Sequence, residues 1–201
     1  MAINCSNLIA QGIAQNCAEP LVAGVEQKGW IVNRADIDFA NVEYADGSTN
    51  ILTALPLQTG KKGFVIEQKG KGFIGSTITF NAKDSGADVT NSITFTVPDL
   101  TPETAQNFVD KVMAGEVVIV LENKWKNLRA SETGTSGDAA FQIFGFFNGL
   151  RLASGTRDIW SADTNGAITL TVEETNAPVS AMYLYNGSYA DTLSILDSWV
   201  A

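Results

Sequence analysis

The chain contains no histidine, and its 201 residues include only two cysteines, Cys5 and Cys17. Without histidine, a serine or cysteine nucleophile has no imidazole base, and a zinc site has no imidazole ligand. Two thiols alone do not make a structural zinc site. If residues 6–17 are helical, a rise of about 1.5 Å per residue holds the two sulfurs too far apart to bridge. Free thiols are therefore favoured, with a disulfide as the alternative.

Long apolar runs are also missing. No stretch approaches the roughly 20 apolar residues that a membrane-spanning helix needs, so membrane insertion is not expected. The opening residues, MAINCSNLIAQGIAQNC, lack the basic and apolar regions of a secretory signal. The length suits a single domain over residues 1–201 with a substantial buried core.

Basic residues are scarce: 13 lysines and arginines stand against 22 acidic residues, for a net charge of −9. This balance disfavours a nucleic-acid-binding protein, whose grip depends on cations that neutralise phosphates. Residues 130–201 hold two basic and eight acidic side chains, whereas residues 60–75 hold four lysines and one acid. An acidic end and a basic arm predict that copies of the chain bind head to tail. The alternative is a solvated acidic surface with a basic hairpin tip.

One helix and several strands are expected. In residues 101–115, Thr101 is a good N-cap, Pro102 suits the first helical position and Gly115 is expected to end the helix in the left-handed conformation. The helical spacing places one apolar face inward, made of Ala105, Phe108, Val109, Val112 and Met113.

The remaining signals are mostly alternation. SITFTV, AITLTVE and STITF alternate apolar with polar residues, which predicts half-buried strands whose inward residues include Phe95, Leu170 and Phe80. The continuous run Val117–Leu121 predicts a central strand covered on both faces. Two short terminal helices are expected. One has Leu8, Ile9 and Ile13 inward and ends near Glu19-Pro20, and the other covers ADTLSILDSWV, where a strand is the alternative. The predicted fold class is mainly β, a sandwich or barrel with one amphipathic helix at about 101–115 packed at its side.

Two motifs resemble ligand-binding sites, but the residues that follow each motif do not fit such a site. Gly70–Gly75 spells G-x-G-x-x-G, but the strand-like STITFNA follows it where a dinucleotide site needs a helix, so a glycine hairpin is predicted. SADTNGAITLTVEE resembles a calcium loop, but Glu173 comes one place late, so Asp163–Gly166 is predicted to be a hairpin turn. Glu173 and Glu174 are neighbours on a strand and point apart, which disfavours paired-carboxylate catalysis. We expect no catalytic, cofactor or metal residues.

The segment AAFQIFGFFNGL is a dense aromatic knot. Phe146 and Phe147 are adjacent in the chain, so they point to opposite faces of a strand, and the three residues Phe144, Phe146 and Phe147 cannot all share one face. The knot is therefore either a two-sided core or a core with one face against a neighbouring subunit.

Two regions give the chain a family resemblance. Roughly the first 45 and the last 60 residues resemble virion structural proteins of tailed bacteriophages. The resemblance lies in the segments GIAQNCAEPLVAGVEQKGWIVNRADI and FGFFNGLRLASGTRDIWSADTNGAITLTVEETNAPVSAMYL. The likeness is to the major tail tube proteins of phages that infect Bacteroidetes-type hosts, and it lies in glycine, aromatic and DTNG spacing.

The resemblance implies a β-domain that assembles in the host cytoplasm into stacked, hexameric rings of a phage tail. Its partners would be itself, other tail proteins and phage DNA, which passes through the lumen without sequence-specific binding. A family member commonly reaches the next ring with a long loop; the arm at about 58–76 and the loop 153–166 are the two candidates. The candidate inter-subunit contacts are Lys61, Lys62, Lys69, Lys71, Phe146, Phe147, Arg157 and Trp160.

Three other functions stay open on the sequence. The chain is compatible with another virion part, such as a head decoration or tail terminator protein. A monomeric β-barrel that binds a small ligand, or an extracellular adhesin or pilin-like module, are the alternatives outside the virion.

Overall fold

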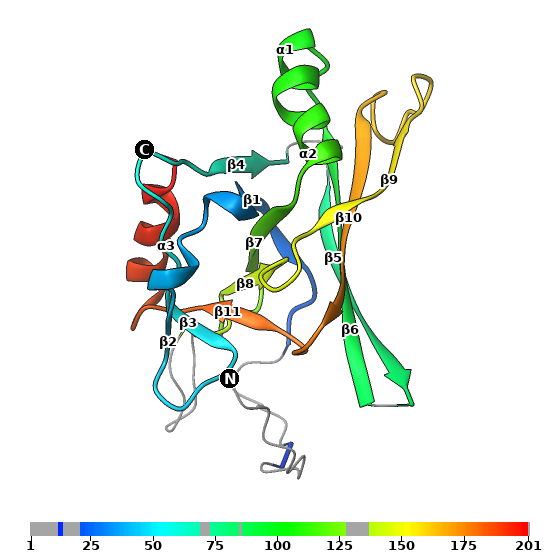
Figure 1. The fold of residues 1–201 in the computed structure, drawn as a ribbon. Helices are drawn as coiled ribbons and strands as arrows, with labels where there is room; N and C mark the ends of the chain where they lie inside the picture. Colours follow the sequence, from blue (N-terminus) through cyan, green and yellow to red (C-terminus); the bar gives the residue numbers. More distant parts are fainter. Residues whose placement is uncertain (1–11, 14–20, 69–72, 85, 128–136, 201) are drawn as a thin grey trace.

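Two β-sheets form the body of the protein (Figure 1). The computed structural model describes residues 12–13, 21–68, 73–84, 86–127 and 137–200. One sheet has seven strands in the order β2-β3-β11-β8-β7-β1-β4, and the other has four in the order β5-β6-β10-β9. The mainly β, sandwich-like fold class with a helix at 101–115 is confirmed, and the described strands form no closed barrel.

The strands divide between the two sheets. The seven-stranded sheet contains β1 (Val25–Asn33), β2 (Glu43–Tyr44), β3 (Ile51–Ala54), β4 (Phe64–Glu67), β7 (Val117–Asn123), β8 (Phe141–Phe144) and β11 (Met182–Leu184). The four-stranded sheet contains β5 (Ile74–Lys83), β6 (Gly86–Val97), β9 (Arg151–Arg157) and β10 (Ile168–Ala177). The helices are α1 (Pro102–Thr104), a π turn (Ala105–Val109), α2 (Asp110–Ala114) and α3 (Tyr189–Ser198), with short 3-10 turns η1 (Arg34–Asp36) and η2 (Phe39–Asn41).

Strand β7 separates two cores. Its residues Ile119 and Leu121 face the four-stranded sheet, and Val118 and Val120 face the opposite side, where α3 packs. All four side chains are fully buried. The expected central strand, covered on both faces, is therefore confirmed.

The core between the two sheets follows the predicted alternation. Phe95 and Leu170 are buried there. Phe80, which the same pattern places inward, is instead 68% exposed. Phe80 lies on β5, an edge strand of its sheet, whereas its partner Val89 on the inner strand β6 is only 6% exposed, so the edge position of β5 accounts for the difference.

The predicted helix is present from Pro102 to Ala114 as a continuous run of α1, the π turn and α2. The Thr101 hydroxyl caps it by accepting the N–H of Thr104 at 3.3 Å. Met113 is 55% exposed, so the predicted inward face is narrower than the spacing suggested. The left-handed cap is wrong, since Gly115 has an extended backbone with φ −112°.

The ends of the chain resolve one alternative. Residues 189–198 are a helix, α3, with Leu196 fully buried. Outside the described residues lie most of the expected N-terminal helix, both cysteines, and Gly70–Gly72 of the glycine motif. Ile13, expected to point inward, is exposed.

Candidate functional site

The four-stranded sheet has an uncovered face of small hydroxyl residues. Because Ile93, Phe95 and Val172 point into the core, their chain neighbours point away from it. Of these outward residues Thr96 is buried, and its hydroxyl donates to Gln68. The others are exposed or half-buried, and Thr94 and Thr171 join their hydroxyls across the strands at 2.9 Å. We call this surface the hydroxyl face; it consists of Thr77, Thr79, Thr90, Ser92, Thr94, Ser154, Thr156, Thr169 and Thr171.

Both edges of the same sheet are open in the part of the chain that the structure describes. Strand β5 pairs only with β6, and β9 pairs only with β10. These edges are ten and seven residues long. Neither contains a proline, and the only charges are Lys83 in β5 and the terminal arginines of β9. A long open edge strand is a template for pairing with another chain.

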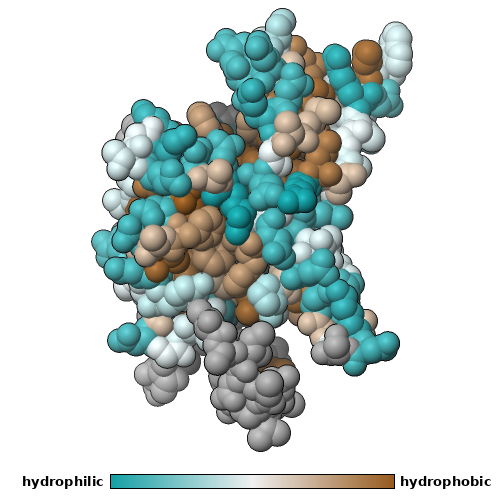
Figure 2. Space-filling view, in the orientation of Figure 1, coloured by the Kyte–Doolittle hydropathy of each residue, from teal (hydrophilic) through white to brown (hydrophobic). Residues whose placement is uncertain are grey.

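The segment 153–166, expected to be a polar loop, is the end of the β9–β10 hairpin. Residues 153–157 belong to β9, and the chain turns at Asp163–Gly166 as predicted. Asn165 and Gly166 both have positive φ, at 53° and 73°. The tip carries two exposed apolar side chains, Ile159 and Trp160. The β9–β10 hairpin projects from the molecule at the upper right of Figure 2.

An apolar groove lies between the helix and the ends of β1 and β4. It has a volume of about 430 Å³ and is lined by Phe64, Phe108 and Val112 among others. Phe64 is 57% exposed. The only charged side chain in the lining is that of Lys111.

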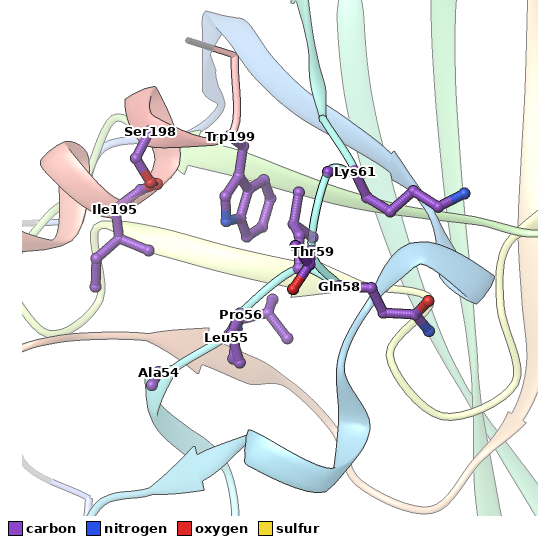
Figure 3. Close-up of a pocket in the computed structure, with 11 residues that line it drawn as sticks. Ala54, Leu55, Pro56, Gln58, Thr59, Lys61, Ile195, Ser198 and Trp199 are labelled. Carbon is purple, nitrogen blue, oxygen red and sulfur yellow. The ribbon is translucent and has the colours of Figure 1, made fainter.

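A second hollow, of about 470 Å³, lies between residues 54–61 and α3 (Figure 3). Three of its polar side chains have partners within the chain. Gln58 donates to the carbonyl of Ala35, Ser198 donates to the carbonyl of Ile195, and Lys61 forms an ion pair with Asp36 at 2.9 Å. No convergent set of reactive groups faces this hollow among the residues described.

The most concentrated ionisable cluster joins Glu122, Lys126 and Tyr189. The Tyr189 hydroxyl donates to Glu122 at 2.6 Å, and the Lys126 ammonium lies 2.5 Å from the same carboxylate. Burial favours the neutral amine, but the hydrogen bond and charge of Glu122 outweigh it and raise the pKa of Lys126. Burial raises the pKa of Tyr189 as well. Because both pKa values are raised, Lys126 stays protonated and Tyr189 stays neutral at neutral pH, so neither is available as a general base.

The structure separates the predicted contact residues. Lys61 is paired to Asp36, Lys62 is exposed, and Lys69 and Lys71 lie outside the described residues. Residues 64–67 of the candidate arm are β4, an edge strand of the chain's own sheet. Arg157 donates to the carbonyl of the turn residue Gly166 at 3.3 Å.

The aromatic knot divides between the two cores. Phe144 packs between the sheets, Phe146 is buried on the α3 side, and Phe147 is half-buried beside it. Phe146 also packs against Phe39, with ring centroids 5.7 Å apart. Both faces of the knot are therefore largely covered by the chain itself.

Glu174 has a structural role that the sequence reasoning missed, having considered this residue only as a possible partner of Glu173 in catalysis. It is 1% exposed, and its carboxylate accepts backbone N–H groups from Gly145, Phe147 and Asn148 and the amide of Asn91. The alternation of β10 contained the signal, because Leu170, Val172 and Glu174 occupy the same inward series.

Comparisons with models of protein families, with curated proteins and with solved structures found no significant match. Among the described residues no group of three or more histidine, cysteine, aspartate or glutamate side chains gathers to hold a metal ion. No described helix has the length and apolarity to cross a membrane.

Proposed function

We propose that this chain is a structural virion protein of a tailed bacteriophage, the major tail tube protein, and that copies of it join side by side into rings. The observation that carries the proposal is the four-stranded sheet, which has two long open edges and one uncovered face. The number of six copies per ring, and the stacking of rings into a tube, come from the family resemblance.

The strand directions suit a ring. Every pair within the four-stranded sheet is antiparallel, so β5 and β9, at its two ends, run in opposite directions. When β9 of one copy lies beside β5 of the next in the same orientation, the new pair is also antiparallel. The junction is heterologous, and a heterologous junction forms a closed ring where its rotation closes.

The hydroxyl face suits the inner wall of a channel for DNA. Proteins hold DNA mainly through lysine and arginine contacts to phosphates. The two central strands, β6 and β10, contain neither lysine nor arginine. A wall of hydroxyl groups on a chain with net charge −9 gives phosphates little to bind. The seven-stranded sheet and α3 would then form the outer body of the ring.

The test is direct imaging of the purified protein at high concentration, combined with light scattering. We expect rings and stacked tubes by negative-stain electron microscopy, and a mass that rises with concentration. A single monomer species at millimolar concentration, without rings, would contradict the proposal and favour a monomeric ligand-binding domain. Closed rings that never stack would favour a tail terminator protein.

A further inference from the structure

The β9–β10 hairpin ends in an exposed apolar tip. Trp160 has 93% of its surface exposed and Ile159 has 66%. A tryptophan side chain removes about 150–250 Å² of surface from water when it is buried. Within the described chain no element covers this tip, so its burial requires another molecule.

The tip is held in one conformation rather than left free. The Asp158 carboxylate accepts the backbone N–H of Trp160 at 3.0 Å. Gly166 lies directly behind Ile159: a Cβ at Gly166 would come within 3.1 Å of the Ile159 carbonyl oxygen. Arg157 ties the base of the tip to the same glycine. A contact loop that is already ordered loses less conformational entropy on binding.

The groove beside the helix is complementary to this tip. Its lining from Phe64, Phe108 and Val112 is apolar, which suits an indole ring and an isoleucine. Lys111 supplies one positive charge, and the tip carries the carboxylates of Asp158 and the exposed Asp163. Asn107 at the rim provides an amide oxygen that can accept the indole N–H.

We infer that Trp160 and Ile159 of one copy dock into the groove between α2 and β4 of the next copy. An apolar projection on one part of a protein and a matching pocket on another make a head-to-tail contact that repeats from copy to copy. This junction rests on the proposed function, because it supplies a second contact between neighbours in the same assembly. It makes Trp160 an anchor residue, with Asp158, Asp163 and Lys111 at the polar rim.

Disulfide trapping tests the junction on the full chain. The native cysteines are replaced (Cys5→Ser, Cys17→Ser), one preparation carries Ile159→Cys and the other carries Lys111→Cys, and the two are mixed under mild oxidation. We expect a disulfide-linked heterodimer to form at least tenfold faster than in a matched mixture in which Lys62→Cys replaces Lys111→Cys. Lys62 is exposed but lies outside the groove. Adding Trp160→Ser to the Ile159→Cys chain is expected to remove most of this advantage.

The outcomes separate the junction from the proposed function. Equal trapping rates at positions 111 and 62, or an undiminished rate with Trp160→Ser, would overturn the docking proposal even where the unmodified protein forms tubes. Selective trapping by a protein that never forms rings would support the junction and contradict the tail tube. Thermal unfolding of each variant is measured first, and because positions 62, 111, 159 and 160 are exposed, we expect little change relative to the chain that carries Cys5→Ser and Cys17→Ser alone.

Discussion

Arg34 and Glu174 hold the same turn from opposite sides. The Glu174 carboxylate accepts the backbone N–H of Phe147 at 2.9 Å, while the Arg34 guanidinium donates to the carbonyl oxygen of the same residue at 2.6 Å. Glu174 comes from the four-stranded sheet and Arg34 from the turn after β1, at the end of the seven-stranded sheet. The turn that carries the aromatic knot therefore joins the two sheets through polar contacts as well as apolar packing.

Loss of the Glu174 carboxylate should strongly destabilise the fold. Glu174→Ala leaves three backbone N–H groups, that of Gly145 buried and those of Phe147 and Asn148 partly buried, and the buried Asn91 amide without their acceptor. We expect the free energy of unfolding in urea to fall by about 3 kcal/mol or more, with an unchanged slope. Glu173→Ala is the matched control, since its side chain points to the other face; a change within about 0.5 kcal/mol is expected there. Equal effects of the two variants would show that the turn does not depend on this carboxylate.

Gly145, in the same turn, should not tolerate a side chain. It has φ +83°, and an added Cβ would lie 2.6 Å from the carbonyl oxygen of Val117. Gly60 has a similar φ of +78° but open space around it. We expect Gly60→Ala to cost about 1–2 kcal/mol from backbone strain alone. Gly145→Ala adds overpacking of about 1–3 kcal/mol. Chemical denaturation of the two variants measures the difference, and similar costs would contradict the steric explanation.

The Asp36 carboxyl should titrate below its ordinary range. The side-chain hydrogen bond from Asn33 lowers the pKa of Asp36; Lys61 also lowers it, and burial opposes the shift. A carboxyl with a lowered pKa stabilises the fold above its unfolded value of about 3.9 and loses that contribution as the pH falls through the folded value. We therefore expect the Asp36 contribution to be lost below about pH 4.

Carboxyl carbon chemical shifts followed by NMR from pH 7 to pH 2 measure this titration. Asn33→Ala removes the largest single cause and Lys61→Ala removes both the hydrogen bond and the charge of the lysine, so the pKa of Asp36 should rise in each variant. An unchanged pKa of Asp36 in Asn33→Ala would contradict the assigned cause.

Blocking the β9 edge should stop assembly without unfolding the chain. Ala153 is a bulged residue, since its neighbours Leu152 and Ser154 pair with consecutive residues of β10 and it has no partner there. A proline at such a position is tolerated within a hairpin but offers no N–H to a further strand. We expect Ala153→Pro to give a folded monomer by circular dichroism and light scattering, with no rings. Ala153→Ser keeps the N–H and should assemble normally; tubes from the proline variant would exclude β9 as a ring junction.

Local patterns in the sequence predicted much of the fold. The run Val117–Leu121 has no polar position, so only a strand covered on both sides accommodates it, and β7 is that strand. The cap Thr101, followed by Pro102 and apolar residues at helical spacing, gave the helix at nearly its true bounds. These features depend on residues close together in the chain, which is why they could be predicted from the sequence.

The errors came from packing between distant segments. Phe80 obeys the alternation of its strand, yet that strand is the edge of its sheet, so the side chain stays in solvent while its partner Val89 is buried. Met113 obeys the helical spacing but lies beyond the surface that covers the helix. The loop 153–166 contains polar residues typical of a loop, but pairing with β10 makes its first part a strand.

The sequence by itself determined the helix at 102–114 and the strands β5, β6, β7 and β10, because periodicity and capping act over a few residues. Only the tertiary structure decided which apolar side chains are covered, since this depends on where distant strands begin and end. For that reason the candidate contacts were sorted only in three dimensions: Phe146 is buried in its own chain, Lys61 is paired to Asp36, and Trp160 is exposed at a hairpin tip.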